Sequence, residues 1–175
     1  MIISMITKMF TYLVLVFQVI FSSAVYAENM ASASIINTKG KVIGSVKLSE
    51  MPSGVLLKVS LSELKPGAHG FHIHAGKQCN PPSFSETKGH FNPFNHPHGF
   101  KNNKEYHLGD LPNLIVSESG DVTQTVWLND ASLSKGLTNI SGRTIVIHDG
   151  PDDYVSQPSG NAGKKIACGV ITIID

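Results

Sequence analysis

Apolar and polar residues alternate along much of this chain at the spacing of a β-strand. Between Val55 and Leu61 every second residue is aliphatic, and the residues between them include Lys58 and Ser60. Because successive side chains of a strand point to opposite faces, this alternation predicts a strand with one buried and one exposed face. Similar β-prone runs cover residues 31–36, 41–48, 70–74, 114–118, 122–128, 143–148 and 167–174.

Turn-forming residues such as Pro52-Ser53-Gly54 and Lys65-Pro66-Gly67 separate these runs, and no stretch has the periodicity of a long helix. About eight strands without a long helix predict an all-β domain, an eight-stranded Greek-key β-barrel or sandwich of the immunoglobulin-like kind. Residues 75–112 and 149–165 interrupt the strands and are rich in Gly, Pro, Asn and Asp. Loops this long are uncommon in a compact domain unless they carry a function, so we expect two functional loops.

The first 27 residues are typical of a secretory signal peptide. Lys8 precedes an apolar run from Phe10 to Val25, and Val25-Tyr26-Ala27 resembles a cleavage site before Glu28. A retained membrane anchor is the alternative, but the run is shorter than a bilayer span and contains Gln18. We therefore expect an exported protein, periplasmic or extracellular, whose single domain covers residues 28–175.

The charge balance argues against a nucleic-acid or membrane-surface partner. The chain has 14 Lys and Arg against 13 Asp and Glu, and Lys8 is the only charged residue of the predicted signal. The mature chain is therefore neutral, without a basic patch along the sequence.

The two cysteines, Cys79 and Cys168, follow the predicted export signal. An oxidising compartment favours a disulfide between them, although two free buried thiols are the alternative. Closing a loop of this length would stabilise the fold by about 4 kcal/mol in the chain-entropy treatment.

Seven of the eight histidines lie between residues 69 and 107, a density that favours metal binding. In the run from Gly70 to His74, the strand period places His72 and His74 on one face and Phe71 and Ile73 on the other. Two imidazoles therefore converge while two apolar side chains enter the core. An H-x-H pair alone is weak support for a metal site.

Further ligand types follow in the first loop and beyond it. Three imidazoles and one carboxylate, from His90, His98, His107 and Asp110, form a four-coordinate set that suits a structural zinc ion. His148 ends an apolar strand and can join His72 and His74 in an imidazole-rich site for copper or zinc.

Five sequence runs, GFHIHAG, GHFNP, HLGDLP, IHDGPDD and GNAGKKIACGVI, resemble the copper/zinc superoxide dismutases in order and spacing. The resemblance implies that one copper ion is bound by His72, His74, His90 and His148, and one zinc ion by His90, His98, His107 and Asp110. It further implies that His90 bridges the two metals and transfers a proton. Asp152 would link His72 to His98 and so orient both ligands.

The implied activity is the conversion of two superoxide anions to dioxygen and hydrogen peroxide by alternating Cu(II) and Cu(I), as a protection against oxidative stress outside the cytoplasm. Homodimers are usual in the family, and a monomer is the alternative. Two other functions stay open: a non-catalytic copper or zinc carrier on the same scaffold, and a structural zinc β-sandwich used in adhesion.

Lys165 occupies the position at which the family usually has an arginine, and the resemblance assigns it to superoxide guidance. Lysine keeps the positive charge but lacks the planar fork of donors, so we expect a somewhat slower, active enzyme. His69 is expected to be a packing residue and His96 an exposed loop residue, neither of them a ligand. Phe71 and Trp127 are expected to lie in the core.

Overall fold

The computed structural model describes residues 29–101, 104–134 and 136–174, whose regular secondary structure is almost entirely β-strand. The strands are β1 (Met30–Asn37), β2 (Val42–Met51), β3 (Gly54–Leu61), β4 (Gly67–His69), β5 (Phe71–His74), β6 (Leu114–Val116), β7 (Val122–Asn129), β8 (Thr144–His148), β9 (Lys165–Val170) and β10 (Thr172–Ile174). Within the described residues, the only helical element is the 3-10 turn η1 (Ser85–Thr87). The predicted all-β class is confirmed.

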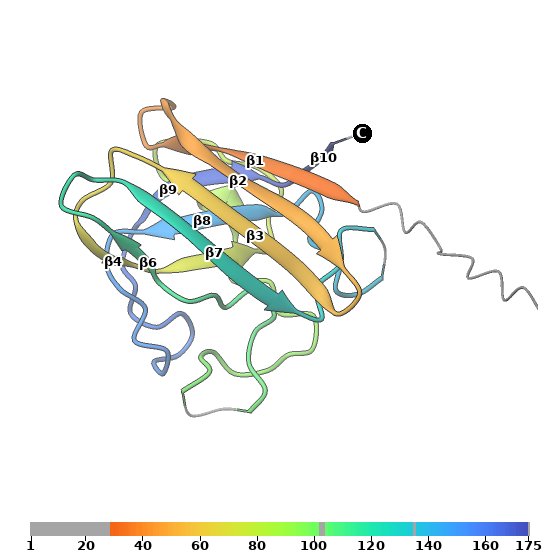
Figure 1. The fold of residues 1–175 in the computed structure, drawn as a ribbon. Coiled ribbons are helices and arrows are strands. Elements are labelled where there is room, and N and C mark those ends of the chain that lie inside the picture. The colour runs from red at the N-terminus through yellow and green to blue at the C-terminus, as the bar shows by residue number, and fades with distance from the viewer. Residues whose placement is uncertain (1–28, 102–103, 135, 175) are drawn as a thin grey trace, which may run out of the picture.

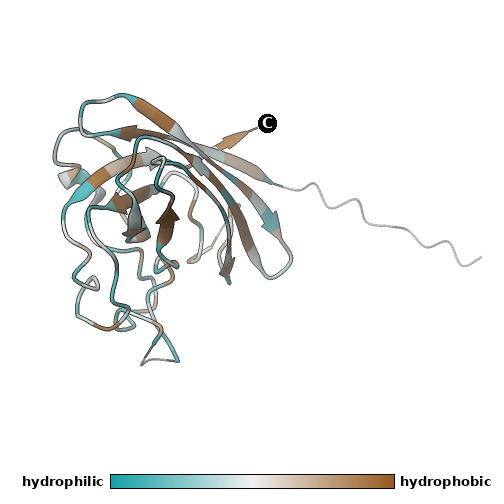
Figure 2. Ribbon diagram, turned by 60° about the vertical axis from the view of Figure 1, so that its left-hand side comes forward, coloured by the Kyte–Doolittle hydropathy of each residue, from teal (hydrophilic) through white to brown (hydrophobic). Residues whose placement is uncertain are grey.

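Most strands form one curled antiparallel sheet, in the order β5-β8-β9-β1-β2-β3-β7, with β10 also pairing with β1. Strands β4 and β6 form a separate two-stranded ribbon. The connection from β7, at one end of the sheet, to β8, near the other end, is a crossover of the kind found in Greek-key proteins. The sheet therefore bends into a half-barrel (Figures 1 and 2).

All eight predicted strands are present, and the last of them is divided in two. The expected strand at residues 70–74 is preceded by β4, which belongs to the other sheet, and the chain changes sheets at Gly70. A side chain does not fit there, since a Cβ atom would lie 2.7 Å from Cβ of Ala162. The last strand divides at Ile171, whose N–H donates to the carbonyl of Arg143, the residue just before β8.

The predicted alternation of β3 is confirmed, because Val55, Leu57, Val59 and Leu61 are all buried. The disulfide between Cys79 and Cys168 is also present and joins the first long loop to β9. A small apolar cluster of Phe84, Val146 and Cys168 surrounds it. The bridge therefore anchors the beginning of the loop that carries most of the expected ligands.

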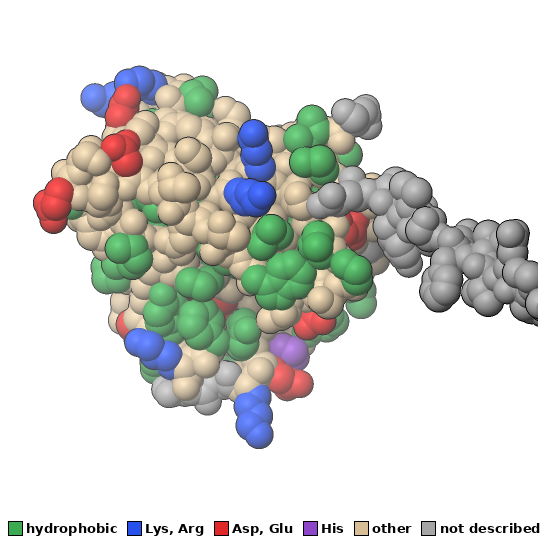
Figure 3. Space-filling model, in the orientation of Figure 1, with side chains coloured by type: hydrophobic (Ala, Val, Ile, Leu, Met, Phe, Trp, Pro, Cys, Tyr) green, Lys and Arg blue, Asp and Glu red, His purple; other side chains and the backbone are tan. Residues whose placement is uncertain are grey.

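Trp127 is not a core residue: it is 40% exposed, and its indole N–H donates to Oδ1 of Asn129 over 2.7 Å. The buried residues of β7 are Val122, Val126 and Leu128, so the strand period turns Trp127 outward. Together with the exposed Phe94 of the first loop, it lines an open groove. Figure 3 shows apolar side chains gathered on this face of the molecule.

The two long loops follow the antiparallel strands β5 and β8 and both lie below the sheet in Figure 1, so ligands far apart in sequence can meet there. The predicted signal peptide and its cleavage site lie outside the described residues. None of the described helical segments is long and apolar enough to cross a membrane.

Candidate metal centre

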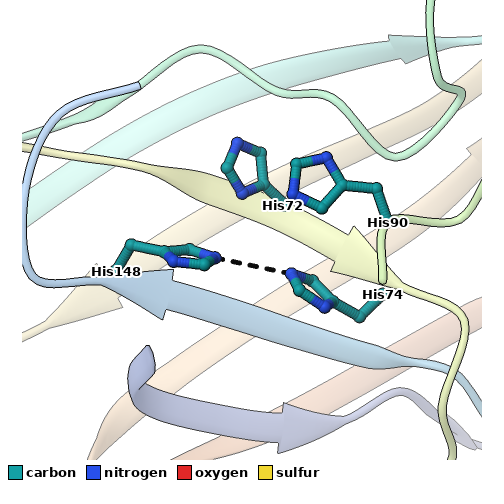
Figure 4. A group of neighbouring side chains, drawn as sticks. All are labelled: His72, His74, His90 and His148. Carbon is teal, nitrogen blue, oxygen red and sulfur yellow. Dashed lines mark hydrogen bonds between the residues drawn. The ribbon is translucent and has the colours of Figure 1, made fainter. Parts of the chain in front are cut away.

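Four imidazoles from three parts of the chain converge beside strands β5 and β8 (Figure 4). Strand β5 supplies His72 and His74, and the end of the neighbouring strand β8 supplies His148. His90 comes from the first long loop, held beside β5 by an isolated bridge to His74. One ring nitrogen from each lies within 4.8 Å of the others, and we call these residues the four-histidine group.

Hydrogen bonds on the outer side of three rings determine which nitrogen faces inward. Nε2 of His72 donates to Oδ2 of Asp152 over 2.7 Å. Nδ1 of His74 donates to the carbonyl of Lys88 over 2.8 Å, and Nδ1 of His148 to that of Gly163 over 3.0 Å. A neutral imidazole carries one N–H, so the other nitrogen of each ring directs a lone pair to the centre of the group.

Those inward lone pairs need a cation between them. Nε2 of His74 and Nε2 of His148 are 3.4 Å apart, drawn as a dashed line in Figure 4. Nδ1 of His72 and Nε2 of His90 are buried without a hydrogen-bond partner in the described part of the chain. Buried polar atoms are rarely left in this state, and four imidazole nitrogens without a thiolate suit copper. The four-histidine group therefore fits a copper ion.

The second group shares His90 and adds His98, His107 and Asp110, and we call it the histidine–aspartate group. Oδ1 of Asp110 lies 2.7 Å from Nδ1 of His90 and 3.1 Å from Nδ1 of His107, and Oδ2 lies 3.0 Å from Nδ1 of His98. The corners of a tetrahedral zinc site with ordinary bond lengths lie roughly 3.3 Å apart. The four residues therefore already have approximately the spacing of a zinc site, with three imidazoles and one carboxylate.

His90 belongs to both groups because its two ring nitrogens face in opposite directions. Nδ1 faces Asp110 and is 3.4 Å from Nδ1 of His107, whereas Nε2 faces the other three imidazoles. A ring in this position can bind two cations at once if both nitrogens are deprotonated, and two bound cations lower the pKa enough to allow this.

Asp152, in the second long loop, lies between the two groups. Its Oδ2 accepts from His72, and its Oδ1 accepts from Nε2 of His98 over 3.1 Å and from the N–H of Tyr154 over 2.7 Å. The predicted link between His72 and His98 is therefore present as a pair of hydrogen bonds. Carboxylates that orient metal-binding imidazoles in this way raise the basicity of the ligand and fix its ring.

Two residues that support Asp152 were not predicted from the sequence. Asn113, just before β6, accepts from the backbone N–H of Asp152 and donates to its carbonyl, both over 2.9 Å. Gly160 packs against the carboxylate so closely that a Cβ atom would lie 1.8 Å from Oδ1 of Asp152. These contacts join residues 39 and 8 positions apart, and no local motif indicates them.

Burial and hydrogen bonding set the protonation of the ligands in the metal-free chain. Burial lowers the pKa of His72 to about 3 and that of His148 to about 4, so both rings are neutral at pH 7. Burial also acts to lower the pKa of His98, but hydrogen bonds to Asp110 and Asp152 outweigh it and raise the pKa to about 9. Burial would raise the pKa of Asp110, yet its histidine neighbours hold that pKa well below the usual range.

The two histidines predicted not to be ligands lie outside both groups. His69 is buried, with Nδ1 2.7 Å from the carbonyl of His148 and Nε2 2.9 Å from that of Lys65. His96 is half-buried where an exposed residue was expected, since its ring stacks on Phe94 and Nδ1 lies 3.3 Å from the carbonyl of Tyr106. Both therefore have packing and hydrogen-bonding roles.

Comparison with known proteins agrees with this geometry. The family model for copper/zinc superoxide dismutase (SODC) matches residues 42–171, the stretch that contains both ligand groups. The chain belongs to the copper/zinc superoxide dismutase family. A copper–zinc superoxide dismutase of Aquifex aeolicus is 46% identical to it over 155 residues, which cover 85% of this chain and 91% of the relative.

Solved structures of the family have the same fold. The Cu/Zn superoxide dismutase from Brucella abortus superposes with a TM-score of 0.67 at 32% identity, over 81% of this chain and 98% of that one. A SOD-like protein from Bacillus subtilis superposes with a TM-score of 0.75 at 38% identity, over 79% and 95%. The predicted fold class, the superoxide dismutase family and its two metals, copper and zinc, are confirmed.

Strand β9 places Lys165 opposite His148 in the pairing with β8. Its Nζ donates to Oγ1 of Thr87 over 2.7 Å and to the carbonyl of Lys88 over 2.9 Å. Burial lowers the pKa of its ammonium group from the usual value. A half-buried positive charge therefore lies at the edge of the four-histidine group.

Proposed function

We propose that this chain disproportionates superoxide at a copper ion bound by His72, His74, His90 and His148. A zinc ion bound by His90, His98, His107 and Asp110 would lie beside it. The observation that best supports this assignment is the orientation of His90, with one ring nitrogen in each group. When bound, copper supplies a one-electron couple between Cu(II) and Cu(I), and zinc supplies fixed charge without redox change.

The protein's own residues have three tasks in this reaction, in which two superoxide anions and two protons give dioxygen and hydrogen peroxide. His90 would carry one of the two protons, taken up at Nε2 when that nitrogen is not bound to copper, and deliver it to the superoxide that is reduced, while the other proton comes from solvent. Lys165 attracts the anion, since a positive charge beside a buried site raises the rate of encounter. Asp152 fixes the rings of His72 and His98, which keeps the inward nitrogens available as ligands.

Superoxide consumption by the purified protein, loaded with copper and zinc, tests this proposal. We expect fast turnover that is lost in the metal-free protein and falls by several orders of magnitude in His148→Ala. The variant His96→Ala is the matched control, because it removes a nearby imidazole that belongs to neither ligand group. If the protein binds one copper ion per chain but superoxide decays no faster than without protein, the carrier function replaces the dismutase.

We also propose that residues 1–27 are removed on export and that the mature domain is residues 28–175, in the periplasm or the extracellular space. The disulfide, which is rare in reducing compartments, supports this assignment. In that location the enzyme would protect against oxidative stress outside the cytoplasm. Mass spectrometry of the protein from an expressing cell should give an N-terminus at Glu28. An intact N-terminal Met1 in the membrane fraction would contradict export by cleavage.

For the oligomeric state we propose a homodimer, the commonest symmetric assembly of soluble proteins. The exposed side chains of Phe94 and Trp127 support it, because apolar groups at one groove form a surface that a second copy can cover. Sedimentation equilibrium should give twice the mass of the mature chain, whereas the mass of one chain over the whole concentration range would show a monomer.

A further inference from the structure

We propose that Thr87 is a positioning residue that holds the ammonium group of Lys165 beside the four-histidine group. This inference rests on the proposed function, since the value of a fixed charge there is the capture of an anion. Thr87 lies in η1, within the first long loop, and its side chain is fully buried. It cannot touch substrate, so any effect on the reaction must pass through Lys165.

The hydroxyl of Thr87 is oriented by a second hydrogen bond. Oγ1 donates to the carbonyl of Phe84 over 2.8 Å and is 2.7 Å from Nζ of Lys165. A hydroxyl has one proton and two lone pairs, and here the carbonyl takes the proton. A lone pair therefore faces the ammonium group, which makes Oγ1 a fixed acceptor for Lys165.

The turn that carries this hydroxyl is itself anchored. Phe84 is fully buried in the cluster around the disulfide, and the N–H of Thr87 donates to its carbonyl over 3.2 Å. The position of Oγ1 is therefore determined by the core of the protein, although the loop as a whole has little regular structure.

A second acceptor connects Lys165 to the candidate copper ligands. The carbonyl of Lys88 accepts from Nζ of Lys165 over 2.9 Å and from Nδ1 of His74 over 2.8 Å. Two of the three ammonium protons are thus committed, and the third is left for an anion at the site. A lysine side chain has a long flexible stem and a single point charge, so two fixed acceptors replace the rigidity of the guanidinium fork.

Without the hydroxyl, the ammonium group would have another partner. The carboxylate of Glu86, the preceding residue, already attracts the charge of Lys165. Losing Oγ1 would leave Nζ with one fixed acceptor and allow it to turn toward Glu86. The charge would remain in the protein, but its position relative to the four-histidine group would change.

The test uses the full mature chain loaded with copper and zinc, and azide as an anionic probe of the copper. Thr87→Val keeps the shape of the side chain and removes the hydroxyl, whereas Thr87→Ser keeps the hydroxyl and is the matched control. We expect the azide dissociation constant to rise roughly three- to tenfold in Thr87→Val, the effect of losing one hydrogen bond of ordinary strength. Thr87→Ser should stay within about twofold of the wild type.

Coupling to Lys165 distinguishes positioning from a general structural effect. In a Lys165→Gln background, Thr87→Val should change azide binding no further, because the group that Thr87 positions is absent. If Thr87→Val weakens azide binding equally with and without Lys165, or leaves it unchanged in the wild-type background, the inference is wrong.

A metal-independent measurement separates this inference from the proposed function. Competitive acetylation of the metal-free protein should label Lys165 more readily in Thr87→Val than in the wild type, while the exposed neighbour Lys164 serves as the internal standard. Equal labelling of Lys165 in both proteins would overturn the inference. If Thr87→Val does not fold, a crystal structure of the wild type decides: Nζ of Lys165 must lie within hydrogen-bonding distance of Oγ1, and any longer separation overturns it.

Discussion

Replacing Gly160 by alanine should weaken zinc binding with only a modest loss of stability. The added Cβ would lie 1.8 Å from Oδ1 of Asp152 and 2.7 Å from Nε2 of His98, at the point where these atoms form a hydrogen bond. Real Cβ atoms do not approach so closely, so the carboxylate must move and the ring of His98 loses its orientation. Removing an outer hydrogen bond of this kind typically lowers metal affinity 10- to 100-fold, on the order of 1.4 to 2.7 kcal/mol.

The backbone contributes a separate and smaller cost. Gly160 has a φ of +68°, in the left-handed region where a side chain costs roughly 1–2 kcal/mol. Gly142 has nearly the same φ, +73°, but a Cβ atom added there would have no neighbour within 4 Å among the described residues. Gly142→Ala therefore carries the backbone cost alone and is the matched control.

Zinc affinity of the metal-free protein, measured by competition with a chromophoric chelator, separates the two costs. We expect Gly160→Ala to bind zinc 10- to 100-fold more weakly and Gly142→Ala to bind like the wild type. Urea denaturation of the metal-free proteins gives the stability of each. Equal zinc affinity in the two variants would refute the reasoning that Asp152 holds His98 in its binding orientation.

Three further predictions follow from the same contacts. Lys165→Gln should lower kcat/KM about tenfold and flatten its dependence on ionic strength, because the charge that attracts superoxide is removed; an unchanged salt dependence would argue against guidance. The pKa of His98 is raised from 6.5 to about 9, so the charged ring stabilises the metal-free fold. This stabilisation is complete below pH 6.5 and is lost as the pH rises through 9. The free energy of unfolding should therefore fall between pH 6.5 and 9 while zinc affinity rises. If urea denaturation and chelator competition show both quantities rising, or both falling, with pH, the prediction is wrong. The double variant Cys79→Ser, Cys168→Ser should lose about 4 kcal/mol in urea denaturation, since the bridge closes a loop with a sequence separation of 89; no loss would show that the disulfide does not constrain the unfolded chain.

The sequence predicts those features that depend on local spacing. The period of two that buries alternate residues of β3 also places His72 and His74 together on β5. The remaining ligands were assigned through motifs whose spacing the family shares. The exposure of Trp127 also follows from the strand period, because Val126 and Leu128 on either side of it face the core.

Features that depend on contacts between distant segments could not be predicted in this way. Asn113 holds the backbone of Asp152 across 39 residues, and Thr87 meets Lys165 across 78. The change of sheet at Gly70 and the break at Ile171 likewise come from neighbours in other strands and loops. Neither residue type nor spacing within one segment contains this information, because each contact joins segments that are far apart in the sequence.

Anomalous diffraction from crystals of the copper- and zinc-loaded protein, recorded at both metal edges, tests the central claim most directly. The account predicts one copper peak within bonding distance of Nε2 of His90 and one zinc peak within bonding distance of Nδ1 of the same ring. A single peak, or two peaks of which only one contacts His90, would contradict a centre in which this imidazole joins both metals.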